Sequence, residues 1–104
     1  MEAAITEIKR AKVSGVDILY FKGKLDEDTS PKLQETLLEV IPSSEKVTLD
    51  FSEISYISSA GLRVLLLSKK YATSLGKTLT LTNVSTEVMK VFEVTNYLDI
   101  LTIN

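Results

Sequence analysis

Two adjacent serines are the residues best placed to carry chemistry in this chain. Ser58 and Ser59 stand in the stretch YISSAG, between an apolar, β-prone run and a strongly helical one. A serine at a strand-to-helix junction resembles the nucleophile of a G-x-S-x-G turn. Ser59 and Gly61 fit that pattern, but Ile57 occupies the place of its first glycine.

The chain contains no histidine and no cysteine. Without an imidazole, a serine hydroxyl lacks its usual general base and is a poor nucleophile. The same absence removes thiol nucleophiles and the usual zinc ligands. We therefore expect a protein that is not an enzyme and that uses no cofactor and no metal.

Two other stretches resemble ligand sites. Asp26, Glu27 and Asp28 form an acidic loop, but three carboxylates without further ligands fall short of what hard cations need, so we interpret them as solvated. The GKT at 76–78 resembles a phosphate-binding loop, yet Tyr71 stands where its first glycine is required. It also leads from a predicted helix into a predicted strand, so we expect no phosphate site there.

Composition and charge narrow the class of protein. With 104 residues, 44% of them hydrophobic, the sequence predicts one domain over residues 1–104 with an ordinary core. Twelve scattered basic residues against 14 acidic ones disfavour nucleic acid as a partner. No apolar run is long enough to cross a membrane, and the first ten residues lack a signal-peptide core. We expect no membrane insertion and a cytoplasmic location.

The hydrophobic pattern predicts strands that alternate with helices. Ser14-Gly15 signals a hairpin turn between strands at 5–13 and 16–21, with Gly23 ending the second. Ser30 is a candidate N-cap, followed by Pro31 in the first helical position. Later elements are predicted as strands at 46–51, 78–83 and 98–103 and helices at about 58–75 and 86–94. The order β-β-α-β-α-β-α-β predicts a single α/β domain in which helices pack on a mixed sheet.

The serine pair then lies at the start of the second helix. The simplest interpretation is that one serine caps this helix by accepting a bond from a free backbone N–H. A helix N-terminus can also receive a phosphate, because its free N–H groups carry partial positive charge. Gly61, in the first turn, would let another protein approach the backbone closely.

Two long stretches resemble a known family. Residues 21–37, FKGKLDEDTSPKLQETL, resemble its strand ending in Gly-x-Leu-Asp before a helix, and residues 47–101 resemble its strand, D-S-S-G-L-like turn, long helix, strand and helix. This is the STAS domain family, and specifically the bacterial anti-sigma factor antagonists. The residues that carry most of the resemblance are Gly23, Leu25, Asp26, Ser59, Gly61 and Leu62.

The resemblance implies partner switching. Family members bind an anti-sigma factor that is also a Ser/Thr kinase, and this binding frees the sigma factor. The kinase phosphorylates a serine at the helix start, the antagonist is released, and a Ser/Thr phosphatase resets it. By this resemblance Ser59 is the phosphoacceptor, with Ser58 as its rival. The implied partner-binding residues are Asp26, Ser58, Ser59, Ala60, Gly61 and Leu62.

The chain departs from the family pattern on both sides of the acceptor. Ser58 stands where the family usually has Asp, and Ala60 where it usually has Ser or Thr. Two alternatives stay open, and the departures at Ser58 and Ala60 support the first of them. One is a STAS accessory subunit of a lipid or solute transporter that acts by constitutive protein binding. The other is a small-ligand or nucleotide-binding domain that uses the same helix start.

Overall fold

The strands form one five-stranded sheet in chain order, β1-β2-β3-β4-β5. The computed structural model describes residues 8–104. β1 and β2 pair antiparallel, and β2, β3, β4 and β5 pair parallel in succession. The elements are β1 (Lys9–Val13), β2 (Val16–Leu25), α1 (Ser30–Val40), the 3-10 turn η1 (Ile41–Ser43), β3 (Lys46–Ile57), α2 (Ser59–Ser74), β4 (Thr78–Thr82), α3 (Thr86–Val94) and β5 (Thr102–Ile103).

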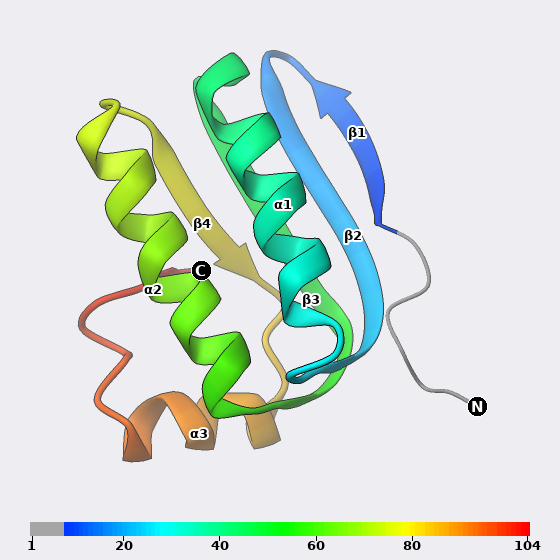
Figure 1. The fold of residues 1–104 in the computed structure, drawn as a ribbon, viewed down its shortest axis with the longest axis vertical. Helices are drawn as coiled ribbons and strands as arrows, with labels where there is room; N and C mark the ends of the chain where they lie inside the picture. The colour runs from blue at the N-terminus through cyan, green and yellow to red at the C-terminus, as the bar shows by residue number, and fades with distance from the viewer. Residues whose placement is uncertain (1–7) are drawn as a thin grey trace.

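The predicted mixed α/β order is confirmed. Figure 1 shows α1 and α2 side by side over one face of the sheet, with α3 across its lower end. Because β2, β3 and β4 run parallel, their carboxyl ends lie at the same end of the sheet. α1 and α2 both begin at that end, so the sheet topology brings their starts together.

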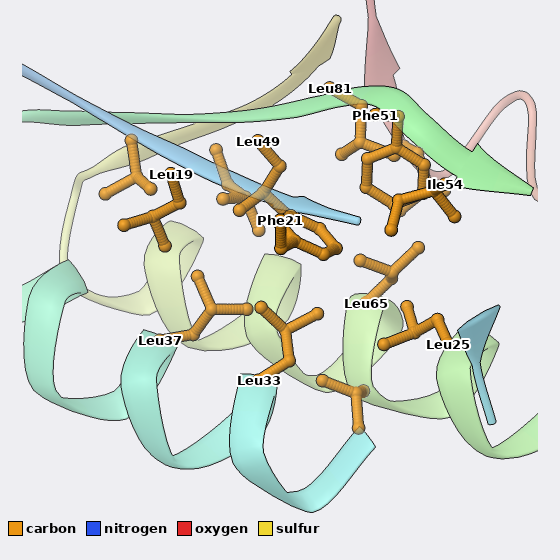
Figure 2. Close-up of a cluster of buried hydrophobic side chains, with 14 of the residues drawn as sticks. Leu19, Phe21, Leu25, Leu33, Leu37, Leu49, Phe51, Ile54, Leu65 and Leu81 are labelled. Carbon is orange, nitrogen blue, oxygen red and sulfur yellow. The ribbon is translucent and has the colours of Figure 1, made fainter. Parts of the chain in front are cut away.

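The main core fills the space between the sheet and the two helices (Figure 2). Leu19 and Leu49 from the strands and Leu33, Leu37 and Leu65 from the helices are fully buried. Full burial of one such side chain contributes about 1.5–3 kcal/mol. This apolar layer fixes α1 and α2 on the sheet and so fixes where each helix begins.

Predicted helix ends agree with the structure. Gly76 has φ +71° and follows α2, and the Lys77 N–H donates to the Ala72 carbonyl at 2.8 Å, which closes the helix with a left-handed turn. Asn96 ends α3 in the same way, with φ +64°. The hairpin turn at Ser14-Gly15 is also confirmed, with φ of +51° and +83°.

Two strands are longer than predicted. β2 continues past Gly23 to Leu25, and β3 continues past residue 51 to Ile57. The two strands stay paired there through register irregularities near Lys22 and Lys24. These shifts place Ile54 and Ile57, three residues apart, on the buried side, and that spacing hides a strand from a search for strict alternation.

The two ends of the chain also differ from the predicted strands. β1 begins at Lys9 in the described residues, and the predicted start at residue 5 lies outside them. The last strand is limited to Thr102–Ile103. The reason is a turn: the Ile100 and Leu101 N–H groups both donate to the Tyr97 carbonyl at 3.0 Å.

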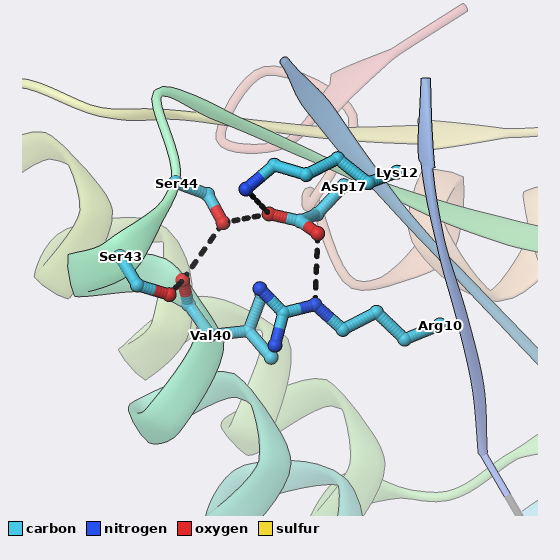
Figure 3. A network of polar contacts seen from close by, with 6 residues as sticks. All are labelled: Arg10, Lys12, Asp17, Val40, Ser43 and Ser44. Carbon is cyan, nitrogen blue, oxygen red and sulfur yellow. Dashed lines mark hydrogen bonds and ion pairs between the residues drawn. The ribbon is translucent and has the colours of Figure 1, made fainter. Parts of the chain in front are cut away.

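A buried carboxylate ties three segments together at the opposite end of the sheet (Figure 3). Asp17 is fully buried on β2, and its Oδ1 accepts a 2.8 Å hydrogen bond from Arg10 Nε on β1. Its Oδ2 contacts Ser44 Oγ, just before β3, and lies 3.9 Å from Lys12 Nζ. The hydrogen bond from Arg10 outweighs burial and, with Ser44, holds the pKa of Asp17 below its ordinary value.

We expect Asp17→Asn to lower the free energy of unfolding at pH 7 by about 1–3 kcal/mol, because charge-assisted bonds to Arg10 and Ser44 are lost. Because the pKa of Asp17 is lower in the native state than in the unfolded state, the ionised carboxylate stabilises the native protein at pH values above the unfolded-state pKa, near 3.9. That contribution to the free energy of unfolding disappears as the pH falls through the native pKa. Urea denaturation at pH 7 and pH 3 checks this: the difference in free energy of unfolding between wild type and Asp17→Asn must be smaller at pH 3. An equal difference at both pH values contradicts a stabilising role for the ionised Asp17 carboxylate.

Candidate functional site

The two serines occupy different positions at the start of α2. Ser58 is the single residue between β3 and α2 and has an extended backbone, with φ −100° and ψ 178°. Its carbonyl accepts the first helical bond, from the Leu62 N–H at 3.0 Å. Ser59 is the first residue of the helix and is exposed.

The hydroxyl of Ser58 is buried and has no hydrogen-bond partner among residues 8–104. Ser58 thus stands in the N-cap position without making the side-chain cap that the simplest interpretation of the pair predicts. The predicted cap of α3 does form, since Ser85 Oγ accepts from the Val88 N–H at 3.2 Å. Of the two site serines, therefore, the exposed one is Ser59.

The end of β2 holds the start of α2 in place through Leu25. The Leu25 carbonyl accepts a 2.9 Å bond from the Ser58 N–H. A Cβ on Gly61 would lie 2.9 Å from the same carbonyl oxygen and 2.8 Å from Ile57 Cγ1. The expectation that Gly61 leaves room for another protein is therefore wrong, because its own chain fills that space.

Asp26 organises the loop between β2 and α1. Its Oδ1 accepts from the N–H groups of Asp28 at 3.0 Å and Thr29 at 3.2 Å. Thr29 Oγ1 donates to the Lys24 carbonyl at 2.7 Å and lies 2.9 Å from the Asp26 N–H, which donates to it. Asp26 directly follows Leu25, so this loop meets the start of α2 at one corner of the molecule.

The prediction that Ser30 is the N-cap of the first helix is wrong. α1 begins at Ser30 itself, Thr29 precedes it, and no side chain supplies a cap bond. Ser30 is buried, and its Oγ has no partner within residues 8–104. Thr29 was missed by the sequence reasoning, although the Asp-x-x-Thr spacing at 26–29 is a pattern by which such loops bond to themselves.

The predicted partner-binding residues differ in accessibility. Ser59 is exposed, and Asp26, Ser58 and Ala60 are half-buried. Gly61 and Leu62 are buried beneath them. The structure therefore brings all six together: four are at least partly exposed, although the Ser58 hydroxyl is itself buried, and two are buried.

The acidic loop and the helices are the features that bear on a metal site and on a membrane span. Residues 8–104 contain no group of three or more acidic residues arranged to hold a metal ion. No helix in this part of the chain is long and apolar enough to cross a membrane. The interpretation of the acidic stretch as solvated holds for Glu27 and Asp28, which are exposed, whereas Asp26 is half-buried and its Oδ1 is bonded to its own loop.

Comparison with known proteins gives consistent matches. Residues 8–102 match the family model described as "Mlab, STAS domain". The anti-sigma-B factor antagonist of Listeria monocytogenes is 34% identical over 99 residues, which cover 93% of this chain and 85% of that protein.

Two solved structures share the fold. An anti-sigma factor antagonist from Mycobacterium paratuberculosis has a TM-score of 0.83 at 15% identity, covering 93% of this chain and 83% of that one. The phosphorylated form of the Bacillus cell fate determinant SpoIIAA has a TM-score of 0.71 at 16% identity, covering 94% and 91%. At these identities the likeness concerns the fold alone.

We expect Gly61→Ala to destabilise the protein by about 1–3 kcal/mol, because the new methyl group meets the Leu25 backbone oxygen. Ser59→Ala, at an exposed neighbouring position, is the control and should change stability by less than about 0.5 kcal/mol. Chemical denaturation of both variants measures the difference. Equal stability of the two would show that α2 is not packed this closely on β2.

The two N-cap serines provide a second comparison. Ser85→Ala removes a cap bond and should cost about 1 kcal/mol. Ser58→Ala removes a hydroxyl that makes no cap bond and should cost less than about 0.5 kcal/mol. Thermal and urea unfolding of each variant test this order, and a larger loss at Ser58 would contradict it.

Proposed function

The chain belongs to the STAS domain family, and we propose that it is an anti-sigma factor antagonist switched off by phosphorylation of Ser59. The observation that carries the proposal is the contrast between the two serines: Ser59 is exposed on the first turn of α2, whereas the Ser58 hydroxyl is buried. A kinase needs an accessible hydroxyl, so this contrast favours Ser59. In this proposal residues 1–104 act as one STAS domain in the cytoplasm.

Relatives support the proposed class. The Listeria monocytogenes relative and a Bacillus subtilis relative, 28% identical over 82 residues, both carry the name anti-sigma-B factor antagonist. A protein of the same fold, SpoIIAA, has a phosphorylated form. From these names we take the partner to be an anti-sigma factor.

The unphosphorylated chain acts by binding. An anti-sigma factor docks on the corner formed by Asp26, Ser58, Ser59 and Ala60, above the buried Gly61 and Leu62, and releases its sigma factor. The chain contributes no catalytic step, because it lacks histidine and cysteine and so has no usual base beside its serines.

The switch is a phosphoryl transfer that the partner catalyses. The Ser59 oxygen forms a bond to the γ-phosphorus of ATP, the bond from that phosphorus to the β,γ-bridging oxygen breaks and ADP leaves, and the hydroxyl proton passes to a base of the kinase. The product carries a charge of about −1.5 to −2 at the helix start. The free N–H groups of the first turn of α2 tolerate that charge, so the fold persists.

The negative charge of the phosphate causes the phosphorylated chain to dissociate from the anti-sigma factor. A partner docked over the phosphate must desolvate it beside Asp26, and like charges in an interface cost several kcal/mol. Since about 1.4 kcal/mol is a tenfold change in affinity, one phosphate suffices to dissociate the complex. A Ser/Thr phosphatase restores the binding form.

A second candidate is a STAS accessory subunit of a lipid or solute transporter. Ser58 and Ala60, which depart from the residues usual around the acceptor, favour it. In that role the same corner is a constitutive docking face. Co-purification with a transporter ATPase, unchanged in Ser59→Asp, would favour this candidate.

The test is incubation with the cognate anti-sigma kinase and ATP, followed by intact mass. We expect one added phosphate on wild type and Ser58→Ala and none on Ser59→Ala. Ser59→Asp should weaken binding of the anti-sigma factor at least about tenfold. Unmodified wild type, or equal modification of Ser59→Ala, would falsify the assignment.

A further inference from the structure

We infer that Arg63 holds the phosphate of phosphorylated Ser59. This inference rests on the proposed function, because it describes the switched-off state. The Arg63 guanidinium would hold the phosphate in one position on the surface of α2.

Position on the helix places Arg63 next to Ser59. Both residues are exposed on α2, and Arg63 lies four residues after Ser59. Helical residues four apart are surface neighbours, with Cβ atoms about 5–6 Å apart. Long helical side chains lean toward the N-terminus, so the Arg63 guanidinium is within reach of the turn that carries Ser59.

The order of charges is also the favourable one. An acidic group that precedes a basic one by four residues stabilises a helix better than the reverse order. A phosphate at the first position of α2 faces the positive end of the helix dipole as well. Guanidinium binds phosphate through two parallel hydrogen bonds, which adds geometry to charge.

Arg63 has no competing ion pair within residues 8–104. Both ion pairs in this part of the chain belong to Asp17, at the other end of β2. The nearest acidic loop, at Asp26, uses its Oδ1 for its own backbone. A new phosphate on Ser59 therefore does not have to displace an existing partner of Arg63 in the described structure.

A phosphate held in this way blocks the docking corner from one fixed position. Held by Arg63 and the first-turn N–H groups, the phosphate stays over the corner where the partner docks. Because the phosphate carries about −1.5 to −2 charges and Arg63 only one positive charge, the pair still presents net negative charge to a docking partner.

The experiment uses the full chain with phosphoserine inserted at position 59 during translation. Phosphorus NMR follows the second ionisation of the phosphate, near pH 6. We expect Arg63→Gln to raise this pKa by about 0.2–0.4 unit, because the dianion loses its paired cation. Lys70→Gln, an exposed cation further along α2, removes the same charge and should raise it by less than about 0.1 unit.

Equal shifts in the two variants, or none in Arg63→Gln, would overturn the inference. Arg63→Lys keeps the charge and should remain closer to wild type than Arg63→Gln. Because the phosphoserine is inserted without a kinase, these outcomes do not depend on whether a kinase modifies Ser59. Failure of kinase labelling would refute the proposed function and leave the titration result intact.

Discussion

The carbonyl group of Leu25 is the contact on which the candidate site depends. It accepts the Ser58 N–H at 2.9 Å, and the first turn of α2 approaches it so closely that residue 61 has no room for a side chain. β2 must extend to Leu25 for this contact to exist, and the register shifts between β2 and β3 bring Leu25 opposite Ile57. The sheet, the acidic loop and the helix start therefore meet at one backbone atom, and the position of Ser59 follows from it.

The residues that hold α2 in place differ from the residues that carry the proposed change of charge. Gly61 and Leu62 are buried and determine where α2 begins, whereas Ser59 and Arg63 are exposed and carry the proposed change of charge. Because a phosphate on Ser59 would enter a site whose backbone is already fixed, no refolding is needed to alter the surface. In the proposed switch, a change in electrostatics alone would be enough to weaken binding of the partner, as expected when a preformed docking face gains charge.

Much of this could be predicted from the sequence because strong local signals agreed with the tertiary structure. Ser85, Gly76 and Asn96 mark helix ends through capping and left-handed turns, and alternation marks β4. Long-range contacts left no such signal. The length of β3 depends on irregular pairing with β2, and the close approach at Gly61 depends on Leu25, 36 positions earlier in the chain. Ser30 resembles a cap in sequence, but Asp26 and Thr29 satisfy the loop instead.

The buried carboxylate of Asp17 has a consequence for how such a protein can change over evolution. It lies eight residues before Leu25 on the same strand, so about 26 Å separates it from the proposed signalling corner. Energetic effects at sites this far apart are usually additive. Substitutions around Asp17 can thus change the stability of the domain without altering the packing of the corner at which the proposed partner docks.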